Sequence, residues 1–235
     1  MTENTTLATT DQQLAIIVPV LNEITVLPAL LRHLQHWQQR GAEVVLVDGG
    51  STDATVTTAR ASGFRVITAP AGRAWQMNAG ARASHSPNLL FLHADTRLPD
   101  NADQYLACTF ATTPLIWGRF DVVIEGTSRL LPLVARLMNL RSRLTGIATG
   151  DQALFITREL FNRVGGFPEQ PLMEDVEISR RLKPFCAPQC LSQKVVTSGR
   201  RWDSRGALRT IVLMWQLRWA YWRGTPAKQL AERYR

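Results

Sequence analysis

The amino-acid sequence predicts an α/β fold, with a mostly parallel central sheet flanked by helices. Short apolar, β-branched runs alternate with stretches whose apolar positions recur at helical spacing, which predicts crossover connections. The strand-like runs end in polar or acidic side chains, as is typical of a sheet whose carboxyl edge binds a ligand. With 235 residues, 45% of them hydrophobic, the chain can bury one substantial core. One domain is expected over residues 14–198.

The elements follow from local pattern. Residues 14–20 predict a strand, and Pro19 lies where its ladder ends. Residues 24–38 carry apolar side chains at helical spacing. A second strand, 43–48, ends in Asp48, and the glycines that follow permit a tight turn before a helix that opens at Ala54. The remaining strands are expected at 64–67, 88–92, 117–125 and 152–157, and the remaining helices at 73–84, at 128–140 and from Glu174 onward.

The fourth strand stops abruptly at polar residues that include His93, Asp95 and Thr96. An aspartate at such a strand end can ligate a hard divalent cation, and the cation can neutralise phosphate oxygens. The same residues are also typical of helix entry, where Asp95 would only cap the next turn. The pattern by itself leaves both roles open.

Several common classes of protein are not indicated. Neither Gly-x-Gly-x-x-Gly after the first strand nor a phosphate-loop Gly-Lys-Ser/Thr occurs. Cys108, Cys186 and Cys190 lack paired Cys-x-x-Cys spacing and fit a reducing cytoplasm. Residues 1–13 are polar, unlike a secretory signal, and are expected to form a flexible tail. A cytoplasmic location is therefore expected.

Five motifs, in this order, resemble the family 2 glycosyltransferases of the GT-A fold. They are Ile17–Glu23, Val45–Asp53, His93–Asp95, Val164–Phe167 and Glu174–Asp175. The resemblance extends from about Leu14 to Lys183. Three further details, Gly72-Arg73-Ala74, Gly150-Asp151-Gln152 and Arg200-Arg201-Trp202, resemble a bacterial subgroup labelled as arsenosugar-biosynthesis glycosyltransferases.

The resemblance implies a metal-dependent, inverting transfer of a sugar from a nucleoside-diphosphate sugar to a hydroxyl acceptor, which could be a small molecule, a lipid or a glycan. It implies Mg²⁺ or Mn²⁺ as cofactor. The residues at positions that match nucleotide-sugar contacts are Pro19, Glu23, Asp48, Gly50, Arg73, His93, Asp95, Asp151, Arg200 and Arg201. Glu23 and Asp48 also suit helix capping, and the three arginines also suit a solvated surface.

The sequence departs from the family at the metal motif, because His93-Ala94-Asp95 stands where Asp-x-Asp is expected. The resemblance keeps Asp95 as the metal ligand, whereas the ribose contact of the first aspartate would pass to His93 in weaker form. No histidine follows the motif in the chain. Diphosphate oxygens, waters or Asp151 would therefore complete the metal shell.

On the acceptor side, the resemblance assigns Asp175 as the general base, with Glu174 as its orienter or as the second candidate. Adjacent carboxylates can raise one another's pKa, which brings a base nearer to neutral pH. The alternative is that both residues only complement the positive end of a helix dipole.

The C-terminal segment, residues 199–235, carries nine basic side chains against two acidic ones and accounts for most of the net charge of +8. Asp203-Ser204 predict the cap of one helix that runs to Arg223 with an apolar, Trp-rich stripe. Its interior arginines argue against a membrane-spanning helix. Residues 204–223 could instead lie on the inner face of the cell membrane, contact a second subunit or pack on the domain.

Two other functions are compatible with parts of this pattern. A nucleotidyltransferase shares the nucleotide-binding half, but its Gly-rich basic loop after the first strand is missing. A non-catalytic basic protein that binds a membrane or nucleic acid would explain the C-terminal charge. That alternative gives no role to the acidic strand ends, so no nucleic-acid partner is expected.

Overall fold

The computed structural model describes residues 13–234, without the side chains of Arg205 and Ala207. The expected N-terminal tail, residues 1–13, lies outside the described part of the chain except for Gln13.

Eight strands form one sheet in the order β3-β2-β1-β4-β7-β6-β8-β5. The pairs β3-β2, β2-β1, β1-β4 and β6-β8 are parallel, whereas β7 is antiparallel to both of its neighbours and β5 is antiparallel to β8. The strands are β1 (Leu14–Val20), β2 (Glu43–Asp48), β3 (Arg65–Thr68), β4 (Asn88–Phe91), β5 (Thr96–Arg97), β6 (Trp117–Glu125), β7 (Leu154–Thr157) and β8 (Gln189–Ser198). The predicted mostly parallel sheet is confirmed.

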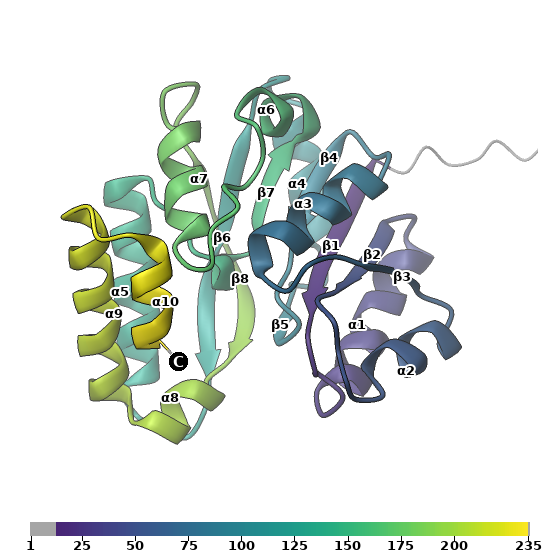
Figure 1. Cartoon of the computed structure of the whole chain (residues 1–235). Helices are drawn as coiled ribbons and strands as arrows, with labels where there is room; N and C mark the ends of the chain where they lie inside the picture. Colours follow the sequence, from purple (N-terminus) through teal and green to yellow (C-terminus); the bar gives the residue numbers. More distant parts are fainter. Residues whose placement is uncertain (1–12, 235) are drawn as a thin grey trace, which may run out of the picture.

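Helices cover both faces of the sheet, and α5, α9 and α10 gather at the end opposite α1 and α2 (Figure 1). In chain order they are α1 (Leu27–Gln39), α2 (Thr55–Ala61), α3 (Arg73–Ala83), α4 (Ala102–Phe110), α5 (Leu131–Thr145), the 3-10 turn η1 (Gly150–Gln152), α6 (Arg158–Arg163), α7 (Glu174–Leu182), α8 (Arg200–Arg205), α9 (Ala207–Trp222) and α10 (Ala227–Tyr234). Among residues 13–234, none of these helices combines the length and apolar character that crossing a bilayer requires.

Alternation along β1 explains why the sheet needs a layer on each face. Ile16 and Val18 belong to a buried cluster that includes Leu34 of α1, whereas Ala15 and Ile17 belong to a second cluster that includes Met77 of α3. Because successive strand residues point to opposite faces, an uninterrupted apolar strand is stable only when both faces are covered. The apolar runs that predicted β1 and β2 therefore also fix the layered architecture.

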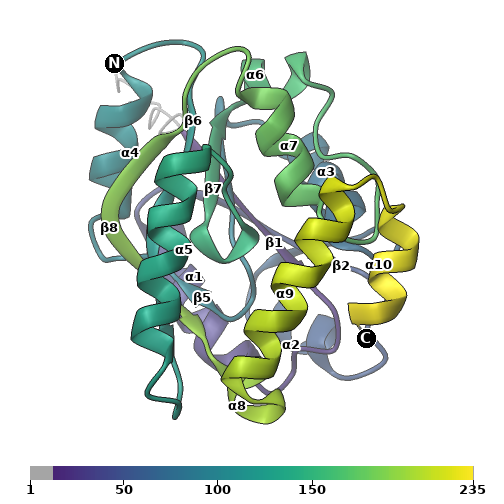
Figure 2. The ribbon, with the colours of Figure 1, turned by 90° about the vertical axis from the view of Figure 1, so that its left-hand side faces the viewer.

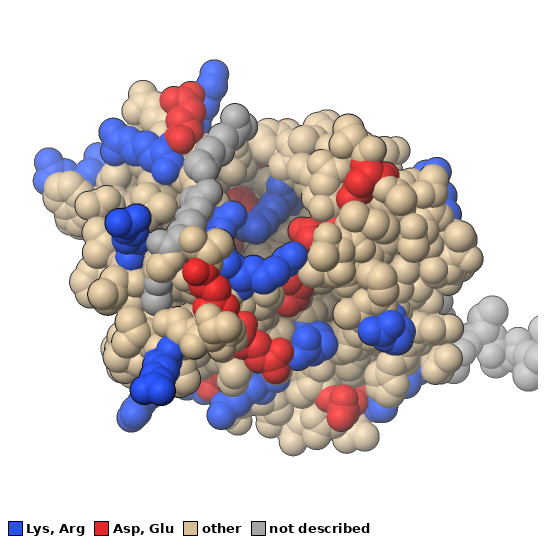
Figure 3. Space-filling view, turned by 90° about the horizontal axis from the view of Figure 1, so that it is seen from below, with Lys and Arg blue, Asp and Glu red and all other residues tan. Residues whose placement is uncertain are grey.

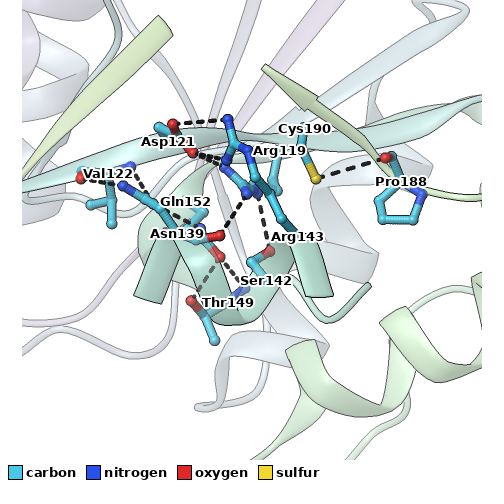
Figure 4. A network of polar contacts seen from close by, with 10 residues as sticks. All are labelled: Arg119, Asp121, Val122, Asn139, Ser142, Arg143, Thr149, Gln152, Pro188 and Cys190. Atoms are coloured by element: carbon cyan, nitrogen blue, oxygen red, sulfur yellow. Dashed lines mark hydrogen bonds and ion pairs between the residues drawn. The ribbon is translucent and has the colours of Figure 1, made fainter. Parts of the chain in front are cut away.

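Helix α5 is held against β6 by a fully buried arginine of that strand, Arg119, in the network shown in Figure 4. Its guanidinium forms an ion pair with Asp121 and donates hydrogen bonds to Ser142 Oγ at 3.0 Å and to the main-chain oxygen of Asn139 at 3.2 Å. A buried charge is tolerable only when it is paired and hydrogen-bonded, and this one is both. The network fixes α5 against β6.

The side-chain amide of Asn139 extends this attachment. Its Nδ2 donates to the main-chain oxygen of Val122 at 3.0 Å, and its Oδ1 accepts from the N–H of Val122 at 2.9 Å and from Nε2 of Gln152 at 3.3 Å. The amide thus satisfies backbone groups of β6 where that strand lacks a neighbouring strand on this side. Through Gln152 it also secures the η1 turn beside the cleft described below.

The C-terminal prediction of one helix from Asp203 to Arg223 is wrong. The chain breaks at Gly206, whose φ of 83° no helix accommodates, and α8 and α9 lie on either side of it. Asp203 does not cap a long helix, because its carboxylate accepts hydrogen bonds from the N–H groups of Thr127 and Ser128. A long-range contact therefore replaces the expected local one.

Candidate functional site

A cleft of about 980 Å³ opens between the carboxyl ends of the central strands and the helices α5, α8 and α9. Seen from that side, acidic and basic side chains gather around a hollow (Figure 3). The acidic side chains that line the cleft are Glu23, Asp95, Asp151, Glu174 and Asp175. The basic ones are Arg73, His93, Arg141, Arg200, Arg201 and Arg218. Nine of the twelve sequence-predicted site residues thus meet in one place.

Asp95 follows β4 and is partly exposed to the cleft. Nη2 of Arg200, which follows β8, lies 3.7 Å from Asp95 Oδ2 and 3.7 Å from Glu23 Oε2. One guanidinium therefore bridges two carboxylates that come from the ends of different strands. Burial raises the pKa of Glu23, an effect that the charge of Arg200 opposes.

Two loops are tied together beside Glu23 by residues that the sequence reasoning did not single out. Asn22 Oδ1 accepts from the N–H of Thr52 at 2.8 Å, and the N–H of Asn22 donates to Ser51 Oγ at 2.9 Å. The N–H of Glu23 donates to Thr55 Oγ1 at 2.9 Å. These bonds hold the loop after β1 against the loop after β2 and position Glu23 at the cleft.

Pro19, Asp48 and Gly50 are not among the described residues that line the cleft. Pro19 is buried within β1, and the carboxylate of Asp48 accepts hydrogen bonds from the N–H groups of Gly50 at 2.9 Å and Ser51 at 3.0 Å. Asp48 thus shapes the turn after β2. Direct contacts of these three residues with a nucleotide stay a prediction.

Arg73 is the first residue of α3 and points its charge toward the acidic side of the cleft. Its field lowers the pKa of Glu23, of Asp151 and of Glu174, although burial is the larger influence on each of these groups. Gly72, which precedes it, has a φ of 137°, and a Cβ there would lie 2.4 Å from the Trp75 ring. The bend that delivers Arg73 therefore needs glycine.

His93 and Asp151 form a pair at the floor of the cleft. His93 is 8% exposed, and its Nδ1 lies 3.2 Å from Asp151 Oδ1. Burial raises the pKa of Asp151, but the hydrogen bond and charge of His93, together with Arg73 and Arg201, hold the pKa below its ordinary value. Asp151 is therefore anionic at neutral pH. Gly150 is packed against this pair, because a Cβ there would lie 2.3 Å from the His93 ring.

Glu174 and Asp175 open α7, directly after Met173 in the left-handed conformation. Asp175 Oδ2 accepts from the N–H of Gly150 at 3.1 Å, and its Oδ1 accepts from the N–H of Val176 at 2.7 Å. These bonds fix the carboxylate at the positive end of the helix. Glu174 is 6% exposed, and burial followed by the charge of Asp175 raises its pKa. The raised pKa expected for this pair is thus found on Glu174.

Replacing Glu174 by glutamine should stabilise the protein increasingly as the pH rises. A raised pKa means that the folded chain holds this proton more tightly than the unfolded chain does. The wild type therefore loses stability as the pH climbs from about 4.5, the ordinary value, through the raised pKa. Glutamine carries no charge and avoids that loss. Thermal unfolding at a series of pH values measures the growing difference in Tm.

The matched control is Glu169→Gln, because Glu169 is exposed just before α7. It should follow the wild type across the series. If the difference in Tm between Glu174→Gln and the wild type is the same at every pH, the pKa of Glu174 is not raised on folding and the prediction is wrong.

The described residues contain no cluster of three or more His, Cys, Asp or Glu side chains that could hold a metal by themselves. Asp95 nevertheless suits a shared site, because it presents a partly exposed carboxylate to the cleft, and Arg200 beside it could bind the phosphates of the same ligand. Hard oxygen ligands are what Mg²⁺ and Mn²⁺ prefer, and Mg²⁺ commonly takes one or two carboxylates with substrate phosphates and water. The residues present therefore fit a cation that is held jointly by Asp95 and a bound diphosphate.

Arg141, Arg218 and Tyr234 also line the cleft but were not singled out from the sequence. Tyr234 belongs to α10, and the Arg201 guanidinium lies 4.2 Å from its ring centroid. Arg141 lies one helical turn after Leu137 and Met138, so helical spacing predicts that all three side chains share one face of a helix. This spacing was the one sequence signal that pointed to Arg141. No local pattern indicates that α5 and α9 face the same cleft.

Comparison with known proteins bears on the first two thirds of the chain. The sequence profile described as "Glycosyl transferase family 2" matches residues 15–162, more than half of the chain. That stretch includes Glu23, Asp95 and Asp151 and ends before Glu174. A search of curated protein sequences finds no match.

Solved structures give a fold match. PcManGT, a mannosyltransferase from Pyrobaculum calidifontis in complex with GDP-Man and Mn²⁺, is 20% identical with a TM-score of 0.60, over 78% of this chain and 56% of that one. S. aureus TarS 1-349 in complex with UDP is 19% identical with a TM-score of 0.62, over 79% and 60%. Glucosyl-3-phosphoglycerate synthase from Mycobacterium tuberculosis, in complex with Mg²⁺ and UDP, is 20% identical with a TM-score of 0.58, over 86% and 77%.

These similarities establish the GT-A fold that the sequence motifs predicted. This chain spans less than two thirds of the length of the first two structures. None of the matches bears on the narrower arsenosugar subgroup.

Proposed function

The chain belongs to glycosyl transferase family 2, and from that membership and the cleft we propose that it transfers a sugar from a nucleoside-diphosphate sugar to a hydroxyl acceptor, with inversion and with the help of Mg²⁺ or Mn²⁺. The observation that carries the proposal is the meeting of Asp95, Asp151 and Asp175 around one cleft that arginines also line. Carboxylates for a cation and a base, with guanidinium groups for phosphates, are the two sets of groups that this reaction needs.

On the donor side, Arg73, Arg200 and Arg201 are the groups that would bind the diphosphate oxygens. A planar guanidinium matches a phosphate with two parallel hydrogen bonds. Asp95 is the residue that would hold the cation, which when bound would neutralise charge on the departing diphosphate. Glu23 is placed to accept a hydrogen bond from the nucleoside.

On the acceptor side, Asp175 is the proposed general base. The acceptor oxygen forms its bond to the anomeric carbon as the bond from that carbon to the diphosphate breaks, and the hydroxyl proton passes to Asp175. The hydrogen bonds from Gly150 and Val176 hold the carboxylate in one orientation while it accepts that proton. Glu174, which is buried and feels the charge of Asp175, is the second candidate for the base.

The C-terminal arginines support this function over a separate basic binding surface. Arg200, Arg201 and Arg218 all line the cleft, beside the carboxylates rather than on an independent face. Three of the basic side chains of the C-terminal segment therefore belong to the proposed site. The structural likeness to proteins solved with GDP-Man and Mn²⁺, or with UDP and Mg²⁺, is in agreement with it.

Thermal unfolding with a panel of nucleoside diphosphates, each with and without Mn²⁺, tests the proposal. At a concentration of about 100 times Kd, the correct nucleotide should add roughly 2.7 kcal/mol to the free energy of unfolding. We expect one nucleotide to stabilise the protein strongly with the cation and much more weakly without it. If no nucleoside diphosphate does so, the proposed function is wrong.

A further inference from the structure

Helices α5 and α9 present the same arrangement to the cleft. From α5 the cleft is lined by Leu137, Met138 and Arg141, and from α9 by Met214, Trp215 and Arg218. In each helix an apolar pair is followed by an arginine one turn later. Figure 2 shows the two helices next to each other on the face turned toward the viewer. Each of these two helices therefore lines the cleft with apolar side chains and one arginine, Arg141 on α5 and Arg218 on α9.

Arg141 is a half-buried side chain with two buried nitrogen atoms that lack a partner. Its Nε and Nη2 are buried without a hydrogen-bond partner. Burial lowers its pKa to about 10, and the positive charge of Arg218 acts in the same direction. Burial also lowers the pKa of Arg218. Two half-buried guanidinium groups that repel each other and lack an ion pair among the described residues are costly, and a bound anion would satisfy both.

The two arginines lie close to the proposed base. Asp175 opposes the lowering of the pKa in both Arg141 and Arg218, and Asp151 does so for Arg218. An anionic group between the arginines would therefore sit next to the carboxylate that accepts the acceptor's proton. The anionic group would therefore belong to the acceptor. The donor diphosphate would instead bind the arginines nearer Asp95, such as Arg200.

The apolar side chains of α5 and α9 around the two arginines are strongly exposed. Leu137 and Leu144 of α5 are 51% and 77% exposed, and Trp215 of α9 is 71% exposed. These side chains continue as stripes at helical spacing, with Leu133 and Leu140 on α5 and Leu208, Val212, Trp219 and Trp222 on α9. Exposed apolar stripes of this extent on two neighbouring helices are typical of a surface that binds an apolar ligand or a lipid.

We propose that the acceptor is a phospholipid with a hydroxylated head group, whose phosphate lies between Arg141 and Arg218 and whose chain lies between α5 and α9. The proposal rests on the proposed function, since it identifies the class of its acceptor. The charge of the two half-buried arginines selects an anionic head group, and the apolar walls select a chain. The position of Asp175 requires a hydroxyl close to the phosphate.

Three probes separate these features. Lauroyl lysophosphatidylglycerol has the chain, the phosphate and the hydroxyls, monolaurin lacks the phosphate, and glycerol 3-phosphate lacks the chain. Binding is measured by calorimetry below the micelle concentration of each lipid. We expect the lysophospholipid to bind at least about tenfold more tightly than either of the others, because each lacks one set of contacts. Equal binding of monolaurin would overturn the role of the arginines, and equal binding of glycerol 3-phosphate would overturn the role of the chain.

The variants follow the same logic. Arg141→Gln/Arg218→Gln should weaken lysophospholipid binding at least about tenfold and leave monolaurin binding unchanged. The matched control is Arg136→Gln/Arg209→Gln, because both residues are exposed on the same two helices outside the cleft. If the two double variants behave alike, the proposed phosphate site is wrong. If the apolar stripes instead join two copies of the chain, sedimentation would show a dimer that the lysophospholipid does not dissociate, which also overturns the proposal.

Nucleotide binding in the same variants separates this inference from the proposed function. Arg141→Gln/Arg218→Gln should keep the stabilisation by nucleoside diphosphate and Mn²⁺, which also shows that the variant is folded. Retained nucleotide binding with no lysophospholipid binding by the wild type would overturn only the acceptor class. Lysophospholipid binding without any nucleotide effect would overturn the proposed transferase and leave a lipid-binding cleft.

Discussion

Replacing Asp175 by asparagine should lower the rate of sugar transfer by about 10³-fold, within the range that a general base contributes. Asparagine has nearly the same shape, and its Oδ1 can still accept the hydrogen bond that Gly150 donates. It cannot accept a proton from the acceptor hydroxyl. The measurement is single-turnover release of nucleoside diphosphate from the sugar nucleotide that stabilises the protein most.

The control for Asp175→Asn is Glu177→Gln, on the same helix but in contact with Arg180, Arg181 and Tyr221. It should retain most of the activity. Nucleotide binding should stay within about twofold of the wild type in both variants, since neither residue is assigned to the donor. An Asp175→Asn protein that retains the wild-type rate would exclude this carboxylate as the base and leave Glu174 as the candidate.

Replacing Asp95 by asparagine should weaken nucleoside diphosphate binding in Mn²⁺ by about 10²-fold, since a metal clamp on phosphate is worth several kcal/mol. Without the cation, wild type and variant should bind the nucleotide similarly. The reason is that Asp95 would act through the cation, whereas the arginines contact phosphate directly. Titration of the nucleotide with and without Mn²⁺ gives the four affinities.

Asp100→Asn is the matched control, because Asp100 is exposed, follows β5 whereas Asp95 precedes it, and does not line the cleft. It should bind nucleotide in Mn²⁺ as the wild type does. Should Asp95→Asn lose as much affinity without Mn²⁺ as with it, the carboxylate would act by positioning Arg200 rather than by holding a metal.

Local pattern was enough to predict β1, β2, β4, β6 and α5, but it did not predict β8 or the break between α8 and α9. The bounds of β2 and β6 agree with the predicted 43–48 and 117–125, because continuous apolar runs between turn residues leave few alternatives. The acidic strand ends were informative for the same reason. Parallel strands bring their carboxyl ends to one edge, so Glu23 and Asp95 were expected near each other before any contact was known.

The features that could not be predicted depend on contacts between distant segments. Asp203 was expected to cap a helix but bonds the backbone of Thr127 and Ser128, about 75 residues away in the chain. Arg141 and Arg218 come from helices that no local signal brings together. Asp48 is a case in which a local contact was missed. Its carboxylate accepts hydrogen bonds from Gly50 and Ser51, and these bonds compete with the ligand contact that the motif implies.

The antiparallel direction of β7 affects how precisely the residues of the cleft are positioned. Leu90 pairs with Phe155 and Phe91 with Leu154, so the beginning of β7 meets the end of β4. Phe155 and Leu154 belong to clusters on opposite faces of the sheet, and sliding by a single position would swap them. The packing of the core therefore fixes the register between β4 and β7. That register in turn fixes the distance between His93, which follows β4, and Asp151, which precedes β7.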